Sequence, residues 1–290
     1  SGYWNKTFDS TTLPDGYYNL SVNATDSATA QNSAISANVS IIIDNTGVNV
    51  SLVTPANNTN TSATSISIQV TANDSLSGLG TVDAQLRSPT GNTGTRQSLS
   101  LASGTIYSGT WSVTYTLPAT DDTYNVTIFA NDTALNQKVT NITTIIVDTT
   151  KPNATTLSPV NSGNASGTTT VRAGANDTLT GIVNVTFQFR NSTNQTSREL
   201  ATLNTGTIFA GEWTASYNTA QLADGTYNIT FNATDFAGNS NVTDTGNYQN
   251  FTATIDNTRP NGTILYPANA TNIRGFFTIN ASVNDTLTKV

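Results

Sequence analysis

Apolar and polar residues alternate one by one along several short segments of this chain. From Tyr227 to Thr234, apolar side chains occupy every second position, and Asn or Thr fills the positions between them. Segments 18–24, 66–72, 183–189 and 277–283 have the same alternation. A period of two gives a β-strand one apolar and one polar face. Since no window of 11 or more residues has helical periodicity, the pattern predicts an all-β protein of half-buried antiparallel strands.

One of these strands belongs to a block that occurs three times. The block reads DGYYNLSVNATD at 15–26, DDTYNVTIFAND at 121–132 and DGTYNITFNATD at 224–235. Recurrence about every 100 residues indicates tandem copies of one small domain. About seven short strands per copy predict a sandwich of two sheets. A Trp precedes each block, and an Asp follows each block with a Pro 11 positions later: Trp4, Trp111 and Trp213; Asp44, Asp148 and Asp256; Pro55, Pro159 and Pro267.

The start of each block resembles the tyrosine corner of Greek-key sandwiches, in which a Tyr hydroxyl bonds back to the preceding backbone. The candidates are Tyr18, Tyr124 and Tyr227. The alternative is a core aromatic beside an ordinary turn. We interpret Trp4, Trp111 and Trp213, which lie one strand earlier, as core residues. A carbohydrate-stacking role is less favoured, because one aromatic side chain per domain makes a poor platform for a sugar.

Composition narrows the classes of function. The chain has 290 residues, a net charge of −7, and no His, Cys or Met. Eleven scattered basic residues argue against nucleic-acid binding, and no apolar stretch is long enough to span a membrane. Glu199 and Glu212 are the only glutamates, and the edges of a sandwich offer no cleft for a catalytic carboxylate pair. We therefore expect no enzymatic activity.

The chain resembles the tandem immunoglobulin-like repeats of prokaryotic surface proteins over essentially its whole length. The resemblance depends on the D-x-T-x-P junctions (148–152 and 256–260), the N-D-x-L-x-G loop (73–78 and 176–181) and the D-G-T-Y-N strand that ends in A-T-D-x-A-G-N (233–239). It implies immunoglobulin-like Greek-key β-sandwiches in a linear array, at the cell surface. The wealth of Asn and Thr favours an archaeal source.

Mapped onto that fold, the repeats predict four parts. Complete domains cover 44–147 and 148–255, between a partial domain over 1–43 (strands E to G) and a partial domain over 256–290 (strands A and B). In the first complete domain the expected strands are A near 48–53, B near 65–72, C near 81–87, E near 110–115, F near 124–130 and G near 141–147.

The resemblance also brings acidic residues together. The start of strand A, the B–C loop and the F–G loop share one pole of such a sandwich. These positions hold Asp44, Asp74 and Asp132 in one domain, Asp148, Asp177 and Asp235 in the next, and Asp256 and Asp285 in the last partial one. Converging carboxylates repel one another unless a cation neutralises them, and Ca²⁺ prefers oxygen ligands. The alternative, compatible with the first, is that each Asp caps its own turn.

Asparagine-linked glycans are the second expected addition. The chain holds roughly two dozen N-x-S/T sequons, and on a strand the Asn and the Ser or Thr face the same way. A polar face rich in Asn and Thr also produces sequons by chance. The favoured sites are Asn19, Asn125, Asn164, Asn194, Asn228 and Asn232. Sequons directly before an Asp are weaker candidates because they lie near the proposed calcium pole: Asn73, Asn131, Asn176 and Asn284.

The leading hypothesis is a structural segment of an extracellular filament, sheath or surface layer. The rivals are the stalk of an adhesin and the non-catalytic stalk of a surface hydrolase. Partial domains leave apolar side chains uncovered, among them Trp4, Leu20, Val22, Phe277, Ile279 and Val283. Either the sequence is a window of a longer array, which we favour, or one copy docks with the next. In both cases we expect copies of the chain as partners in a polymer or lattice.

Overall fold

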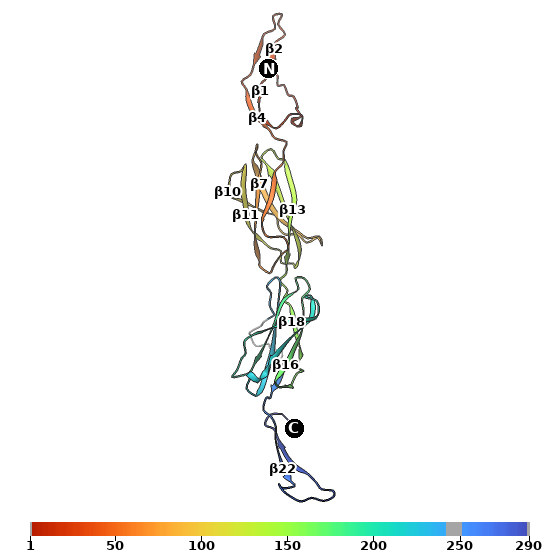
Figure 1. Cartoon of the computed structure of the whole chain (residues 1–290). Helices are drawn as coiled ribbons and strands as arrows, with labels where there is room; N and C mark the ends of the chain where they lie inside the picture. The colour runs from red at the N-terminus through yellow and green to blue at the C-terminus, as the bar shows by residue number, and fades with distance from the viewer. Residues whose placement is uncertain (1, 242–250, 289–290) are drawn as a thin grey trace. The chain divides into compact units, whose positions relative to one another are not determined.

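The computed structural model describes residues 2–241 and 251–288. Its regular elements are β-strands apart from two 3-10 turns among these residues, Ser10–Thr12 (η1) and Thr219–Gln221 (η2). Internal contacts divide the chain into two units, Ser1–Thr149 and Thr150–Val290, and Figure 1 labels strands of both. None of the helices in the described ranges has the length and apolar character needed to cross a membrane. The all-β prediction is confirmed.

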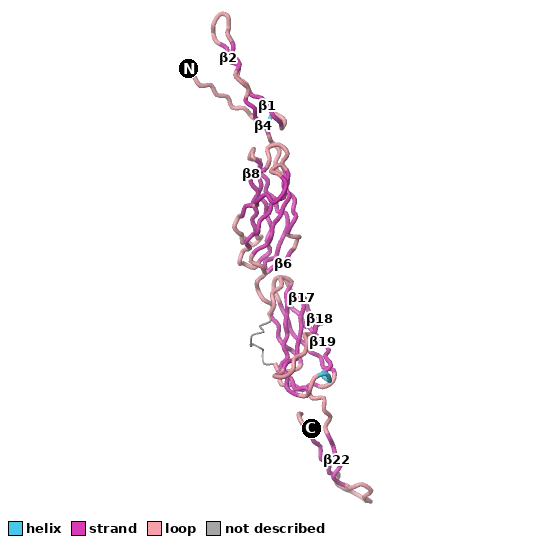
Figure 2. Tube along the Cα trace, turned by 90° about the vertical axis from the view of Figure 1, so that its left-hand side faces the viewer, coloured by secondary structure: helices cyan, strands magenta, loops and turns pink. Residues whose placement is uncertain are grey.

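The first unit contains a two-sheet sandwich, with strand orders β10-β11-β7-β5 and β6-β13-β12-β8-β9. Figure 2 shows its strands in magenta. Neighbouring strands are antiparallel except β6 and β13, which are parallel. The strands are β5 (Asn49–Thr54), β6 (Thr59–Thr61), β7 (Ser65–Asn73), β8 (Leu79–Arg87), β9 (Gln97–Ser98), β10 (Ser100–Gly104), β11 (Ser108–Thr116), β12 (Asp122–Asp132) and β13 (Gln137–Val147).

All six strands expected for this domain are present: β5, β7, β8, β11, β12 and β13 overlap the ranges given for A, B, C, E, F and G. The alternation identifies them because one face is buried. In β7, for example, Ile68, Val70 and Ala72 are buried while their neighbours are not. Sequence reasoning missed β6, β9 and β10. Segment 97–104 pairs first with β8 and then with β11, so it passes between the sheets, and within it only Leu99 is buried in the core.

The second unit repeats this plan in one continuous sheet of order β14-β16-β19-β18-β17-β20-β21-β15. The sheet is continuous because β18 pairs with β17 through Ala201 and with β19 from Thr202 onward. The strands are β14 (Asn153–Ser158), β15 (Gly163–Ala165), β16 (Thr168–Asn176), β17 (Ile182–Arg190), β18 (Glu199–Gly206), β19 (Ala210–Asn218), β20 (Gly225–Asp235) and β21 (Thr252–Ile255).

Buried side chains from facing strands fill each sandwich. In the first unit they include Trp111 and Tyr115 of β11 and Tyr124 of β12. The second unit has an aromatic group, in which the Phe189 ring lies 4.9 Å from Tyr217 and 6.2 Å from Phe187, centroid to centroid. Aromatic pairs at these separations add about 0.5–1.5 kcal/mol each to the stabilisation from area burial. These cores hold the strand ends that carry the candidate site.

Paired strands without a facing sheet occur near both ends of the described chain. They are β1 (Gly16–Leu20) with β4 (Val39–Ile43), β2 (Asn23–Thr25) with β3 (Ser33–Ile35), and β22 (Asn261–Tyr266) with β23 (Asn280–Asn284). Apolar side chains of these strands are exposed, among them Leu20 and Val283. Val22, Phe277 and Ile279, which lie in the same segments but outside the strands, are exposed as well.

One sequence prediction is wrong here. The interpretation of Trp4 as a core residue on strand E fails, because its side chain is 98 % exposed and the residue lies outside any strand. The exposure agrees with the expectation that a partial domain leaves Trp4 uncovered. The physical reason is that residues 2–43 form only two-stranded pairs, so no second sheet covers the indole. Trp111 and Trp213, which have complete sandwiches around them, are 8 % and 7 % exposed.

Candidate metal centre

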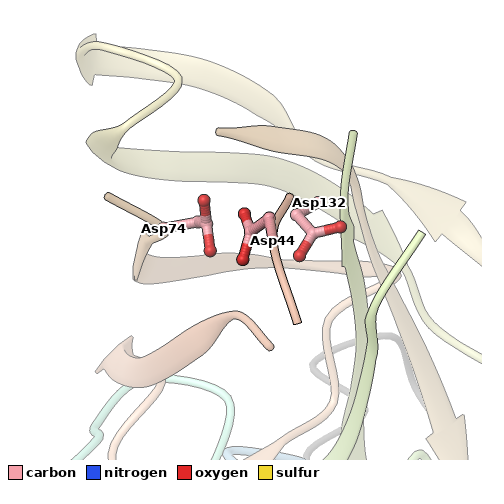
Figure 3. Close-up of side chains that lie close together, drawn as sticks. All are labelled: Asp44, Asp74 and Asp132. Carbon is pink, nitrogen blue, oxygen red and sulfur yellow. The ribbon is translucent and has the colours of Figure 1, made fainter. Parts of the chain in front are cut away.

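Three aspartates that are far apart in sequence meet in the first unit. Asp44 follows β4, Asp74 follows β7, and Asp132 ends β12. All three are buried, with relative exposures of 7 %, 4 % and 0 %. One carboxylate oxygen from each lies within 4.8 Å of the others, and Figure 3 shows Asp44 between the other two side chains. The structure therefore brings together the three residues that the sequence placed at one pole.

Asp74 organises the loop between β7 and β8. Its Oδ1 accepts hydrogen bonds from the backbone N–H groups of Leu76 (3.1 Å), Ser77 (3.0 Å) and Gly78 (2.8 Å). Gly78 has φ +76°, in the left-handed region that favours glycine. The Ser77 N–H also reaches Asp44 Oδ2 at 3.0 Å. Asp44 and Asp74 therefore share one donor, which holds their carboxylates side by side.

Asn136 connects Asp132 with Asp44. Its backbone N–H and its side-chain Nδ2 donate to the two carboxylate oxygens of Asp132, at 2.9 Å and 2.8 Å. The same Nδ2 donates to the backbone carbonyl of Asp44 at 2.9 Å. The loop after β12 is therefore tied to the residue that begins the domain. Sequence reasoning gave Asn136 no role, although the equivalent Asn239 ends the quoted A-T-D-x-A-G-N motif.

The second and third repeats keep parts of this network. Asp148, Asp177 and Asp235 are buried and form a second group whose ligand atoms lie within 4.8 Å. Asp177 Oδ1 accepts from the N–H groups of Leu179, Thr180 and Gly181, and Asp235 accepts from Asn239 N and Nδ2, each at 2.8 Å. In the last repeat, Asp285 Oδ1 caps Leu287 and Thr288, and Asp256 Oδ2 accepts from Thr288 Oγ1 at 2.7 Å.

The local turn bonds of the capping alternative are thus present, but they do not use every carboxylate oxygen of the group. Among the described residues, no hydrogen bond reaches Oδ2 of Asp74. Three buried carboxylates at this spacing bring negative charges together where water screens them poorly. An oxygen-rich group of this kind suits Ca²⁺, which takes 6–8 oxygen ligands and accepts backbone carbonyls as part of its shell.

Each proposed tyrosine-corner residue makes the hydrogen bond that a corner requires. The hydroxyl of Tyr18 donates to the Pro14 carbonyl at 2.8 Å. Tyr124 and Tyr227 donate to the carbonyls of Thr120 and Ala223, at 2.9 Å and 3.0 Å. Every one of these bonds spans four residues, so the three corners have the same local geometry. Tyr124 and Tyr227 are buried, which fixes the entry of β12 and β20.

Sequence reasoning gave no role to a second set of aspartates, which begin the same repeated blocks. Asp15 Oδ1 accepts from Asn45 N at 2.7 Å, Asp121 Oδ1 from Thr149 N at 2.8 Å, and Asp224 Oδ1 from Asn257 N at 2.7 Å. Each bond therefore fixes the backbone of the residue that directly follows Asp44, Asp148 or Asp256, the aspartates at the junctions between repeats. The signal was available, because Asp15, Asp121 and Asp224 recur at the head of the repeated block.

The proposed glycan acceptors differ in their accessibility. Asn19, Asn164 and Asn194 are exposed, whereas Asn125, Asn228 and Asn232 are partly buried. Asn232 Oδ1 accepts a hydrogen bond from Ser240 Oγ at 2.6 Å, and Asn19 Oδ1 accepts from Ser40 Oγ at 2.9 Å. In the sequon of Asn125 the hydroxyl residue, Thr127, is buried. A register shift between Val126 and Thr127 explains why the simple alternation fails there.

The two glutamates do not form a pair. Glu212 accepts from Arg172 Nε at 2.8 Å, and Glu199 accepts from Ser197 Oγ at 2.8 Å. The Arg172 bond lowers the pKa of Glu212 from its ordinary value. Glu212 is therefore held as a carboxylate by its cationic neighbour and does not resemble a general acid, which needs a raised pKa.

Two of the family models that match parts of this chain describe immunoglobulin-like domains. Residues 152–230 match the sequence model of a bacterial Ig domain, and residues 211–290 match that of a bacterial Ig-like domain (group 3). Residues 52–169 match a domain of unknown function, DUF7743. A search of curated proteins found no match. Among solved structures, the FN1–FN3 domains of chicken CNTN1 are similar, with 11 % identity, a TM-score of 0.30, and coverage of 75 % of this chain and 74 % of that chain.

Bacterial Ig-like domains are typical of extracellular or surface proteins. The archaeal source expected from composition stays a prediction. The strand topology and the sequence matches together identify the chain as a tandem of immunoglobulin-like β-sandwich domains.

Proposed function

We propose that this chain is a structural segment of an extracellular filament, sheath or surface layer. The repeated sandwiches support this role because tandem copies of one domain suit a structural segment. The rival roles are the stalk of an adhesin and the non-catalytic stalk of a surface hydrolase. All three are non-enzymatic within this chain, and they differ in what the remainder of the protein would carry.

The proposal includes a structural Ca²⁺ bound by Asp44, Asp74 and Asp132, and another bound by Asp148, Asp177 and Asp235. The observation that carries it is the burial of three carboxylates within 4.8 Å of one another. A divalent cation there would neutralise charges that otherwise repel. Because Asp44 directly precedes the residue that Asp15 holds, the ion would also fix the chain where one repeat passes into the next.

Calorimetric melting in the presence of Ca²⁺ and of EGTA tests this metal. If Ca²⁺ is present at about 100 times its Kd, binding stabilises the folded domain by about 2.7 kcal/mol. We therefore expect EGTA to lower the melting temperature by roughly 10–20 °C for a domain of this size. A melting temperature that EGTA leaves unchanged would mean that the aspartates only cap their turns.

A pair of variants separates the metal from the capping role. Asp74→Asn keeps an oxygen that can accept the loop N–H groups but removes the charge, so we expect it to abolish the Ca²⁺ response of the first sandwich alone, because Asp148, Asp177 and Asp235 are unchanged. Asp122→Asn is the matched control, since Asp122 lies in the same sandwich and also accepts several hydrogen bonds. It should retain the full response. An equal loss in both variants would contradict a specific site.

The expected partners of the segment are copies of itself. Support comes from the exposed apolar side chains of the β1–β4 and β22–β23 pairs, since uncovered strands favour pairing with another chain. Electron microscopy of the native cell surface discriminates the candidate functions. A regular polymer or lattice that antibodies to this chain decorate is expected for the leading role. Isolated projections with a globular tip would instead support a stalk.

A further inference from the structure

The first strand after each junction begins with an asparagine in a sequon. These residues are Asn49 of β5, Asn153 of β14 and Asn261 of β22, each five positions after its junction aspartate. β5 and β14 are the end strands of their sheets, and β22 has β23 as its single neighbour. The three sequons therefore lie at equivalent places on edge strands.

A second sequon asparagine lies directly opposite each of them. The antiparallel register pairs Asn49 with Asn73, Asn153 with Asn176, and Asn261 with Asn284. All six residues are exposed, and each begins an N-x-S/T triplet. The fold thus presents one pair of acceptor amides per repeat, which the linear sequence does not reveal because its members are more than 20 residues apart.

The side chains of the edge strand are oriented for modification. In β5 exposure alternates, so Val50 and Leu52 pack against the core while Asn49 and Ser51 are exposed on the outer face. Asn153 and Thr155 of β14 follow the same pattern. Other sequon asparagines are tied into the fold instead: the Oδ1 of Asn57, Asn131 and Asn141 accepts from Thr144 N (3.0 Å), Thr81 N (2.9 Å) and Thr127 Oγ1 (2.7 Å), respectively.

We propose that Asn49, Asn153 and Asn261 each carry an N-linked glycan and that the asparagines opposite them do not. Directly opposed residues have Cβ atoms only about 4.5–5.5 Å apart, which is too close for two attached sugars. Asn73 has Asn49 on one side and Ser108 on the other, whereas Asn49 has a strand on one side alone. Asn176 is likewise flanked by Asn153 and Ala210. In these two pairs only the edge member has an open side. Asn261 is assigned from its equivalent position in the repeat, because β22 and β23 are each other's single neighbour.

The modification is a glycosyl transfer from a sugar activated as a phosphate or pyrophosphate ester. The amide nitrogen of Asn forms a bond to the anomeric carbon as the bond from that carbon to the phosphate oxygen breaks. The amide loses one proton, and the phosphate or pyrophosphate departs with the electron pair. No oxidation or reduction occurs. Ser51, Thr155 and Thr263 supply the hydroxyl that completes each sequon.

A glycan at this position would also protect the sheet. Edge strands expose unpaired backbone groups, and natural proteins often block them with charged side chains. β5, β14 and β22 contain no Lys, Arg, Asp or Glu. A bulky hydrophilic sugar at the first residue of β5 and of β14 would take the place of charge and hinder pairing of these two edges with a foreign strand.

Site-specific mass spectrometry of the protein from its native surface tests the proposal, which depends on the proposed surface location. Cleavage before Asp44 and Asp74 releases peptide 44–73 with both members of the first pair, and electron-transfer fragmentation then assigns the sugar. We expect it on Asn49 and not on Asn73. Glycans elsewhere with Asn49, Asn153 and Asn261 bare would overturn this inference alone. A chain without any glycan would overturn the expected glycosylation as well, while leaving the calcium experiment unaffected.

Variants produced in the source cells provide the matched comparison. Ser51→Ala destroys the sequon but keeps Asn49, and it should remove one glycan mass from peptide 44–73. Asn73→Gln removes the opposite acceptor and should leave that mass unchanged. Both positions are exposed, so neither variant should alter folding. Loss of the sugar in Asn73→Gln, with retention in Ser51→Ala, would reverse the assignment.

Discussion

Asp15 Oδ1 accepts a hydrogen bond of 2.7 Å from the backbone N–H of Asn45, a residue 30 positions later. Asp121 with Thr149 and Asp224 with Asn257 repeat this relationship. Thr46 and Thr258 add hydroxyl hydrogen bonds to Asp15 and Asp224, and these bonds lower the pKa of both carboxyl groups. The first Asp of each repeated block thus binds the backbone at the point where the chain passes from one repeat to the next.

We predict that Asp121→Ala frees the backbone at Thr149 without unfolding the sandwich. The Thr149 N–H loses its acceptor, so its hydrogen exchange should accelerate, because local opening then requires no broken bond. Amide exchange followed by NMR or mass spectrometry measures this. Asp83→Ala serves as control, since Asp83 bonds Arg96 and Ser98 on the sheet surface. Faster exchange at Thr149 in the control too would indicate general destabilisation.

We predict that Tyr124→Phe destabilises the first sandwich by about 1 kcal/mol, with somewhat more if the Thr120 carbonyl stays unsatisfied. Only the hydroxyl that bonds Thr120 is lost, and the buried ring remains. Calorimetry should show a decrease of roughly 4–8 °C in the melting temperature of this domain. Tyr107→Phe alters a half-exposed ring in the same sandwich and should change little. Equal effects would show that the corner bond adds no stability.

Acid should release the loop between β8 and β9. Asp122 Oδ2 accepts from Ser88 Oγ at 2.7 Å and Asn92 Nδ2 at 2.8 Å, and also from the Thr90 hydroxyl. The bonds from Thr90, Ser88 and Asn92 lower the pKa of Asp122 from 3.8 to about 2. A lowered pKa in the folded state stabilises the protein above the unfolded value, and the gain disappears as the pH falls through the folded value. The loss should therefore occur between about pH 4 and pH 2.

Asp122→Asn should remove this part of the pH dependence. The variant is expected to be less stable than the wild type at pH 6, with the difference vanishing near pH 2. Urea unfolding at a series of pH values measures the two curves. Parallel curves over the whole range would contradict the assignment of this acid transition to Asp122.

The sequence was most informative where one face of a strand is buried. The alternation in 66–72 and the block at 121–132 located β7 and β12 because burial imposes period two on both. It failed for β10, whose residues are all exposed, since no core constrains their order. It also failed at Thr127, where a register shift turns a polar residue inward.

The candidate metal site could likewise be predicted only in part from the sequence. Asp44, Asp74 and Asp132 could be grouped because their spacing recurs and the resemblance assigns their loops to one pole. The shared Ser77 donor and the bridging Asn136 could not be predicted, because they depend on how two loops meet in space. The pairing of Asn49 with Asn73 depends in the same way on strand register.

The three tryptophans should differ sharply in accessibility and in their effect on stability. Trp4 is 98 % exposed, whereas Trp111 and Trp213 are buried, so acrylamide should quench one component of the fluorescence readily. Trp4→Phe should abolish that component and change stability by no more than about 0.5 kcal/mol. Trp111→Ala removes a buried ring and should cost about 3–5 kcal/mol, lowering only the calorimetric transition of the first sandwich. Trp213→Ala should act in the same way on the second. Trp111→Phe keeps part of the packing, and because the indole Nε1 has no partner within the described residues, its cost should be clearly smaller. A readily quenched component that survives in Trp4→Phe would show that another indole is accessible and that the core around Trp111 or Trp213 is open.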